Sequence, residues 1–426
     1  MKKFKLIFIS ILSLWLLWVT LWAWVLPFNM APDECLHLET AKFFQTEKRL
    51  PVAGSEEITF IERDSCMGAT YISTPFLNYI VASVFINNKG LVNIERDYLA
   101  ARFSSIFFGA IFVIFLYLFL SKFFAKNRLV AISSFISILL IPQVTYIFSY
   151  LNHEAYSLAA SSFLLFVSLN FYNLSQEGIK KTRNFLFLGL AISLQLFTKS
   201  NFYLLLLIPL VILILKLWQT KKLYLKNLFI LGGIIIILSG WFFVRNYFLY
   251  KDVMGIKIYQ TTVRNNFGTR TYAQAGWNYY DVLFKSKWIE ETVSSFYGRF
   301  GYMTVEIDPV MQWIFRSFIF LGIVGVIKKL SKIKNLKSSI KNNIWYFLFA
   351  LLIPANIAIS LYNTLYFDFQ NQGRYLFPIL IPLMVLVSRG IFALNDNKEN
   401  QKTMLIAVIA GSILLSFWSF LYLPKI

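Results

Sequence analysis

The sequence is poor in charged residues, and acidic residues are the scarcer kind. Only 15% of its 426 residues are charged, against roughly 25% in soluble domains. The chain carries 41 Lys and Arg against 21 Asp and Glu, and 58% of its residues are hydrophobic. Repeated apolar runs of about 20 residues exclude a soluble globular protein and indicate a polytopic, all-α membrane protein. The basic residues lie between the apolar runs and form no single patch, which argues against a nucleic-acid-binding role.

Cysteine and familiar catalytic motifs are also scarce. Cys35 and Cys66 show no metal-type spacing, and both fall in the first polar loop, where the sequence leaves their pairing open. The chain lacks a Walker-type phosphate loop, an HExxH zinc motif and a GxSxG nucleophile elbow, which excludes the enzyme classes built on them. It has no internal repeat, so residues 1–426 are expected to form a single integral membrane domain.

Eleven apolar runs are expected to cross the membrane. The first starts with basic residues like a signal peptide, but it is too long for one and has no small-residue cleavage site, so it is interpreted as a retained anchor. The expected spans are 5–27, 98–121, 128–148, 155–173, 184–198, 202–218, 227–248, 310–327, 344–362, 375–393 and 403–423.

A weaker apolar run at 72–87 decides the sidedness of the chain. It is shorter than the roughly 20 residues of a span. If it does not cross, the basic clusters near residues 2–5, 122–128, 180–183, 221–226 and 328–341 all lie inside. The short outer loops then keep only Lys199, Arg374 and Lys425. The positive-inside rule favours this arrangement, with the N-terminus inside and 72–87 as an interfacial helix on the outer face of the cell membrane.

Two large outer loops follow from this topology, at 28–97 and 250–308. In the first, Asp33 to Phe44 alternates apolar and polar residues like an amphipathic interfacial helix, with Asp33 placed as its N-cap. The second is rich in Tyr, Asn, Thr, Gly and Arg, a composition suited to contacting a polar ligand.

The segment Pro32-Asp33-Glu34-Cys35-Leu36-His37 carries the strongest chemical pattern. Acidic pairs at a bilayer surface are costly near lipid and usually functional. Asp33 is a candidate general base for an acceptor hydroxyl, with Glu34 positioning the acceptor or a metal ion. His37 lies four residues after Asp33, on the same helix face. The plain alternative is a solvated acidic helix cap, where negative charge is favoured.

A second histidine–acid segment, Asn152-His153-Glu154, begins a span on the same outer face. It is either a polar turn with a helix cap or part of the site around Asp33. Asp33, Glu34, His153 and Glu154 could together hold a divalent cation, since carboxylate and imidazole ligands suit Mg or Mn. No spacing among them is diagnostic of a metal.

Cations at outer helix ends complete the candidate site. Arg374 lies in Gln372-Gly373-Arg374-Tyr375, against the positive-inside bias, and a guanidinium binds phosphate bidentately. The alternative is a snorkelling arginine. Lys199, in Thr198-Lys199-Ser200-Asn201, and Arg245 are each more often interfacial anchors than ligands. Acids that act on a hydroxyl and cations that meet a phosphate are the requirement of glycosyl transfer from a lipid phosphate.

In their order along the chain, these features resemble the GT-C class of membrane glycosyltransferases, which use polyprenyl-phosphate-linked sugars. More narrowly, the chain is similar to a bacterial family of GT-C-like proteins with four matching elements. These are Pro-Asp-Glu-x-x-His (32–37), a lysine-containing turn (198–201), Ser-Phe-Tyr-Gly-Arg-Phe-Gly (295–301) and Gln-Gly-Arg-Tyr-Leu-x-Pro (372–378). Cys35 departs from the small or proline residue often found there, and no functional effect is expected from it.

The resemblance implies a GT-C-like bundle of about 11 transmembrane helices that transfers a sugar from a polyprenyl phosphate to an envelope glycan, with inversion. Asp33 would be the base, and Arg374 would meet the leaving phosphate, with Lys199 or Arg245. The expected substrate-binding residues are His37, His153, Glu154, Lys199, Asn201, Arg245, Arg299, Gln372, Arg374 and Tyr375. The alternatives are a flippase for lipid-linked saccharides and a non-catalytic subunit of an envelope-assembly complex.

Overall fold

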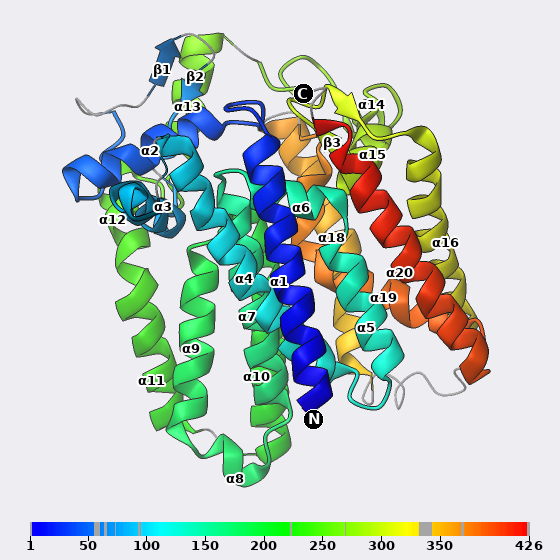
Figure 1. Cartoon of the computed structure of the whole chain (residues 1–426). Coiled ribbons are helices and arrows are strands. Elements are labelled where there is room, and N and C mark those ends of the chain that lie inside the picture. The colour runs from blue at the N-terminus through cyan, green and yellow to red at the C-terminus, as the bar shows by residue number, and fades with distance from the viewer. Residues whose placement is uncertain are drawn as a thin grey trace. The chain divides into compact units, whose positions relative to one another are not determined.

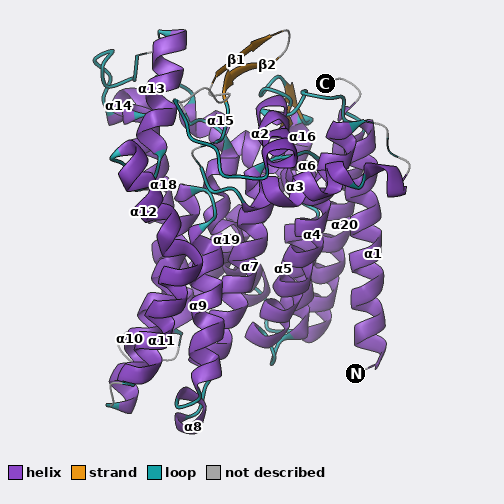
Figure 2. Ribbon diagram, turned by 90° about the vertical axis from the view of Figure 1, so that its left-hand side faces the viewer, coloured by secondary structure: helices purple, strands orange, loops and turns teal. Residues whose placement is uncertain are grey.

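The computed structural model describes residues 2–54, 60–63, 66–72, 74–92, 94, 96–221, 224–268, 270–331, 343–367 and 370–423. The chain folds as two compact units. Unit 1 comprises residues 1–115 and 147–270, and unit 2 comprises residues 116–146 and 271–426. Helices dominate, and the strands of the described residues are confined to two short hairpins (Figure 2). Lys425 and the basic positions from 332 to 341 lie outside the described residues.

Unit 1 has its chain reversals at two opposite ends. The N-terminus and α8 lie at one end, and α2, α3 and the β1–β2 hairpin lie at the other (Figure 1). Its elements are α1 (Lys2–Val25), α2 (Glu34–Glu47), β1 (Phe60–Arg63), β2 (Cys66–Ala69), α3 (Leu77–Asn87), η1 (Lys89–Val92), α4 (Asp97–Phe123, which continues into unit 2), α7 (His153–Tyr172), α8 (Gln176–Ile179), α9 (Thr182–Leu196), η2 (Ser200–Leu206), α10 (Leu207–Thr220), α11 (Leu225–Ile235), η3 (Ile236–Gly240), α12 (Trp241–Tyr250) and α13 (Ile256–Phe267).

Unit 2 is built around the packing of α19 against α16, α18 and α5. Its elements are α5 (Arg128–Leu139), α6 (Pro142–Ser149, which continues into unit 1), α14 (Tyr279–Phe284), α15 (Trp288–Gly298), β3 (Arg299–Phe300), β4 (Val305–Glu306), α16 (Pro309–Ser331), α18 (Ile344–Tyr366), η4 (Gly373–Ile379), α19 (Leu380–Ala393) and α20 (Lys398–Phe420). The second outer loop, expected at 250–308, contains the helices α14 and α15 and the β3–β4 hairpin, which its composition did not predict.

The long apolar helices lie at the expected spans, and one expected span forms a shorter helix. The described residues form nine helices long and apolar enough to cross a membrane, or ten if the bent pair α5 and α6 counts as one span. That pair bends by 54° just before Pro142, since proline cannot continue the hydrogen bonding of a helix. The expected span at 184–198 forms α9, a helix of 15 residues. At 1.5 Å per residue α9 is about 22 Å long, shorter than the other spans. It begins just after α8 and ends just before Lys199, which bonds Glu154 at the opposite end of unit 1, so it connects the two ends as the expected span does (Figure 1).

The short helix expected at 72–87 is present as α3. It has 11 residues, which at 1.5 Å per residue gives about 16 Å, too little to cross a bilayer. The amphipathic helix expected from Asp33 to Phe44 is also present, as α2, and it packs against α3. Most of its first two turns are buried by the rest of unit 1.

Glycines let α16 and α19 approach closely in unit 2. A Cβ added to Gly325 would lie 1.9 Å from the carbonyl oxygen of Gly390, and one added to Gly322 would lie 2.8 Å from the Cα of Val387. Backbone atoms cannot yield as a flexible side chain can, so this crossing requires residues without a Cβ. Gly232, on α11, has nothing within 4 Å of the corresponding position.

We predict that Gly325→Ala lowers the thermal unfolding midpoint of the purified protein, because α16 and α19 must separate. Over-packing of this kind costs about 1–3 kcal/mol. Gly232→Ala is the matched control and should leave the midpoint unchanged or raise it, since alanine favours a helix over glycine by roughly 1 kcal/mol. Equal midpoints for Gly325→Ala and the unmodified protein would contradict the close packing.

Candidate active site

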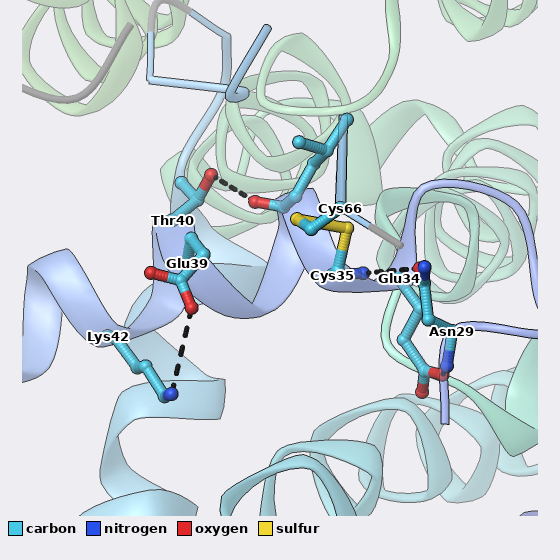
Figure 3. The surroundings of a disulfide bond; sticks show 8 residues. Asn29, Glu34, Cys35, Glu39, Thr40, Lys42 and Cys66 are labelled. Atoms are coloured by element: carbon cyan, nitrogen blue, oxygen red, sulfur yellow. Dashed lines mark hydrogen bonds and ion pairs between the residues drawn. A yellow bond between two sulfur atoms is a disulfide. The ribbon is translucent and has the colours of Figure 1, made fainter. Parts of the chain in front are cut away.

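The first turn of α2 is capped by a residue other than the expected one. Asp33 occupies the N-cap position, but its side chain makes no capping hydrogen bond there. Instead, the side-chain oxygen of Asn29 accepts the backbone N–H of Cys35 at 3.1 Å (Figure 3). Asp33 has a left-handed backbone with φ +63°, a conformation that non-glycine residues adopt rarely and often at functional positions. Asn29 thus performs the capping that the sequence assigned to the Asp33 carboxylate.

Glu34 forms a fully buried ion pair with Arg102 of α4. The Arg102 Nε donates to one carboxylate oxygen at 2.6 Å, and its Nη2 donates to the other at 2.7 Å. The backbone N–H of Asn29 also donates to Glu34, at 3.0 Å. Both carboxylate oxygens are therefore engaged, and neither Glu34 nor Arg102 is exposed to solvent. This geometry suits a positioning role for Glu34 better than a proton-transfer role.

Arg102 also holds the end of α1. Its guanidinium donates to the backbone oxygens of Ala23 at 2.6 Å, Leu26 at 2.7 Å and Pro27 at 3.1 Å. The last carbonyls of a helix have no partner within the helix. One side chain thus joins the end of α1 to the start of α2 and sets the chain reversal that carries Asp33.

Two tyrosines contact Asp33 and His37. The Tyr71 hydroxyl donates to Asp33 Oδ2 at 3.0 Å, and the Tyr71 ring stacks on His37 with centroids 4.2 Å apart. The Tyr79 hydroxyl lies 2.8 Å from His37 Nδ1. Burial raises the pKa of Tyr79 well above its ordinary value, so the phenol keeps its proton near neutral pH. Asp33 is half-buried, whereas His37 is buried.

The two cysteines form a disulfide in this loop. Cys35 of α2 is bonded to Cys66 of β2, which settles the pairing that the sequence left open (Figure 3). The β1–β2 hairpin pairs Phe60 with Ala69 and Arg63 with Cys66. Cys35, Leu36, Ile61 and Cys66 form a small buried cluster, against which Tyr71 packs.

The second histidine–acid segment lies beside the first. The His153 and His37 rings are 5.0 Å apart by their centroids, in an edge-to-face arrangement. Glu154 is buried and accepts from Lys199 Nζ at 2.8 Å, and His153 Nε2 lies 3.6 Å from Glu154. Asn152 is the N-cap of α7, since its side chain accepts the N–H of Ala155 at 2.9 Å. The segment is therefore both a helix cap and a part of the cluster around Asp33.

The proposed cation ligands do not form a metal site. Among the residues that the structure describes, no group of three or more His, Cys, Asp or Glu side chains is placed to hold a metal ion. Arg102 engages Glu34 and Lys199 engages Glu154, so two of the four suggested ligands already have cationic partners. The expectation of Mg or Mn bound by Asp33, Glu34, His153 and Glu154 does not fit this geometry.

The two candidate cations of unit 1, Lys199 and Arg245, have different partners. Lys199 belongs to the cluster through Glu154, and its backbone N–H donates to Ser157 at 3.1 Å. Asn201 follows it as the second residue of η2 and is half-buried. Arg245 instead donates to the backbone oxygen of Pro51 at 2.5 Å, which ties α12 to the first outer loop.

In unit 2, the two later motifs pack against each other. The backbone N–H of Gly373 donates to Ser295 Oγ at 2.7 Å, and a Cβ on Gly373 would lie 2.2 Å from the backbone nitrogen of Phe296. η4 therefore lies directly against α15, and only glycine fits at the contact. Arg374 follows in η4 and is buried, with its guanidinium 5.6 Å from the ring centroid of Tyr375.

The neighbours of Arg374 have structural contacts of their own. Gln372 is the N-cap residue of η4, and the Tyr375 backbone oxygen accepts from Asn356 at 3.2 Å. Arg299 is paired with Glu306 at 2.8 Å and Glu291 at 3.9 Å, across the β3–β4 hairpin and α15. These pairs give Arg299 a role in holding the loop that faces η4.

Sequence reasoning missed Arg102, Tyr71, Tyr79 and Asn29. Arg102 carried a usable signal, since it is a charged residue inside the expected span 98–121, and such residues are rare and usually paired. The two tyrosines lie among many aromatic residues and show no distinguishing pattern. Asn29 lies five residues before Glu34, outside the usual capping offsets.

The fold is that of the GT-C glycosyltransferases. The chain is similar to ArnT from Cupriavidus metallidurans, solved with bound undecaprenyl phosphate, with a TM-score of 0.51, 12% identity, and coverage of 99% of this chain and 69% of that one. It is also similar to the oligosaccharyltransferase of Archaeoglobus fulgidus, solved with a tethered acceptor peptide, with a TM-score of 0.52 and 12% identity. That alignment covers 98% of this chain but only 55% of the oligosaccharyltransferase. At this identity, the likeness concerns the fold.

The sequence places the chain in a family. Residues 93–384 match the family described as predicted membrane protein (DUF2142), and the chain belongs to it. The match begins after the segment 32–37 and includes residues 372–378. Comparison with curated proteins finds no match.

We predict that Arg102→Met strongly destabilises the protein, because it leaves the buried Glu34 carboxylate without its cation. Breaking a buried ion pair on one side costs about 3–5 kcal/mol. The double variant Glu34→Met/Arg102→Met should unfold at a higher temperature than Arg102→Met alone, since it buries no unpaired charge. Thermal unfolding of the purified variants measures this. A double variant less stable than Arg102→Met would show that the backbone contacts of Arg102, and not its pairing with Glu34, dominate.

Proposed function

We propose that the protein is a glycosyltransferase of the cytoplasmic membrane with its active site on the outer face. It moves a sugar from a polyprenyl phosphate to a cell-envelope glycan. The observation that carries the proposal is the cluster around Asp33, in which carboxylates, imidazoles and a lysine converge at one end of unit 1. The GT-C fold supports it, because the ArnT structure of that fold was solved with undecaprenyl phosphate. A flippase would instead need cations along a path through the membrane.

Asp33 acts as the general base in this mechanism. It accepts the proton of the acceptor hydroxyl as that oxygen attacks the anomeric carbon. The bond between the anomeric carbon and the phosphate oxygen breaks, and the polyprenyl phosphate leaves with the bonding electrons. Attack opposite the leaving group inverts the anomeric centre. Glu34 is assigned the role of fixing Asp33, because both of its oxygens are bound to Arg102 or the backbone.

Cations are proposed to bind the phosphate of the bound donor and to keep that contact as it leaves. Lys199 is the candidate in unit 1, since its ammonium group is half-buried and is held at the cluster by Glu154. Arg374 is the candidate in unit 2, since a buried guanidinium can offer two parallel N–H groups to phosphate. His37, His153 and Asn201 are proposed to contact the sugar or the acceptor. Gln372, Tyr375, Arg245 and Arg299 are proposed to bind the substrates as well.

Two features support an outward orientation of the α2–α3 end of unit 1. Disulfides form and persist in oxidising compartments outside the cytoplasm, and the Cys35–Cys66 disulfide lies at this end. Lys180 and Lys181 directly follow α8, and Arg183 lies in the first turn of α9. Figure 1 shows α8 at the end opposite α2 and α3, as expected for basic residues of the inner face.

We predict that Asp33→Asn abolishes sugar transfer while the protein still inserts and binds donor. The amide keeps the size of the carboxylate but cannot accept the proton, so kcat should fall by at least about 100-fold. Release of undecaprenyl phosphate from synthetic donors by the purified protein measures kcat and KM. Mass spectrometry of envelope glycans from cells with and without the gene would identify the sugar and the polymer.

Arg374→Ala provides the contrast to Asp33→Asn. Loss of a phosphate contact should chiefly raise the KM for the donor, because the contact is already made in the ground state. Transfer near the unmodified rate by Asp33→Asn would rule out Asp33 as the base, and an unchanged donor KM in Arg374→Ala would remove the arginine from the donor site.

We predict that single cysteines at Asn88 and Gln176 react from opposite sides of the membrane. Both positions are exposed, at the C-terminal end of α3 and the start of α8. The chain has only two native cysteines, and both are in the disulfide, so background reaction is low. A membrane-impermeant maleimide on intact cells should label Asn88→Cys but label Gln176→Cys only after lysis. The reverse pattern would place the Asp33 cluster in the cytoplasm.

A further inference from the structure

Tyr71 contacts both histidine–acid segments of the cluster. Its hydroxyl donates to Asp33 Oδ2 at 3.0 Å, and its ring stacks on His37 with centroids 4.2 Å apart. The same ring lies edge-on to His153 at 5.1 Å and stacks on Tyr259 of α13 at 5.6 Å. A hydrogen bond from a fixed donor to one carboxylate oxygen sets the plane of the carboxylate. It therefore limits the directions from which Asp33 can accept a proton.

The chain that carries Tyr71 is attached to α2 at two points. The first is the disulfide between Cys35 and Cys66, and the second is the hydrogen bond from the Tyr71 backbone N–H to Thr40 Oγ1 at 3.2 Å. Figure 3 shows Cys35 and Thr40 on the same helix, with Cys66 bonded to the first. His37 lies between these two attachment points in the sequence. The Tyr71 ring is therefore held over His37 by contacts on either side of it.

The disulfide is the stronger of the two attachments. An isolated two-stranded hairpin is marginally stable, and β1 and β2 each have only four residues. The buried cluster beneath the hairpin contains Cys35, Leu36, Ile61 and Cys66, so half of it consists of the disulfide itself. Only four residues separate Cys66 from Tyr71. Movement of the hairpin would therefore carry the Tyr71 hydroxyl away from Asp33.

We propose that Tyr71 is a positioning residue for Asp33 and that the Cys35–Cys66 disulfide holds it in place, so that sugar transfer depends on oxidation of these two cysteines. The inference rests on the proposed role of Asp33 as the base. It replaces the expectation that Cys35 has no functional effect. Displacement of a reacting group by about 1 Å can cost 10²-fold in rate. Loss of the Tyr71 hydroxyl or of the disulfide, which would shift Asp33 without touching the donor site, should therefore lower kcat.

The test begins with Tyr71→Phe and Cys35→Ser/Cys66→Ser, purified in detergent and compared with the unmodified protein. Phenylalanine keeps the ring on His37 and removes only the hydroxyl. Both variants should lose about tenfold or more in kcat and keep the donor KM within about threefold, since ground-state donor contacts are unchanged. Tyr172→Phe, at the far end of α7, is the matched control and should keep full activity.

Combining the variants separates positioning from general loss of structure. The triple variant combines Tyr71→Phe with Cys35→Ser and Cys66→Ser. If the disulfide acts through Tyr71, this variant should be no slower than Tyr71→Phe, because both changes remove the same interaction. Multiplied losses would show that the disulfide acts elsewhere and would overturn the proposal. Tyr71→Phe with the kcat of the unmodified protein would also overturn it.

Reduction provides a reversible form of the same experiment. A phosphine reductant cleaves the S–S bond to two thiols, taking up oxygen from water to become the phosphine oxide. Reduction should lower the kcat of the unmodified protein to that of the serine variant, and reoxidation by oxidised glutathione should restore it. The serine variant should respond to neither reagent. Full activity of the reduced protein, with two thiols per chain confirmed by mass spectrometry, would overturn the proposal.

Hydrogen–deuterium exchange separates this proposal from the proposed function. Reduction should increase backbone exchange at residues 66–72, whatever reaction the protein catalyses. Unchanged exchange would show that the disulfide does not hold Tyr71 and would overturn the inference while leaving the glycosyltransferase proposal intact. An oxidised protein that transfers no sugar from any polyprenyl-phosphate donor would overturn the proposed function, and the kinetic role of Tyr71 with it.

Discussion

The buried contact between Arg102 and Glu34 is the constraint on which the candidate site depends. Arg102 binds both oxygens of Glu34 and three backbone carbonyls at the end of α1. A buried charge is tolerated only when it is paired and its hydrogen bonds are satisfied. These contacts therefore fix the reversal between α1 and α2 in the structure. Asp33, which lies in that reversal with a left-handed backbone, is held where the rest of the cluster can reach it.

The contacts made around that reversal give the three carboxylates different surroundings. Glu34 and Glu154 are buried and paired with cations, whereas Asp33 is half-buried and accepts a hydrogen bond from the phenol of Tyr71. The stacked rings of Tyr71 and His37, with His153 edge-on to both, join the two histidine–acid segments. Such a division suits one carboxylate to proton transfer and the others to fixing the site. The likeness to GT-C structures concerns the fold, and these different surroundings come from the side chains of this chain.

Much of the fold could be predicted from local patterns, because each helix must satisfy its own backbone in the membrane. The apolar runs mark most of the long helices, and α2 and the cap of α7 lie where the sequence places them. The span expected at 184–198 forms α9 within two residues of the expected bounds, because its apolar run marks the helix. The capping role of Asp33 was wrong because Asn29 competes for the same N–H group from outside the local window. The bend before Pro142 could be expected from proline itself.

The sequence by itself determined that this is a polytopic membrane protein and which few ionisable residues deserve a chemical role. A charged residue in an apolar chain is conspicuous because its burial is costly. Only the tertiary structure decided which partner each of them meets. Glu34 meets Arg102 across 68 positions, Glu154 meets Lys199 across 45, and Asp33 meets Tyr71 across 38. The properties of a carboxylate depend on the charges and donors within a few ångströms, and those neighbours come from segments that no local pattern connects.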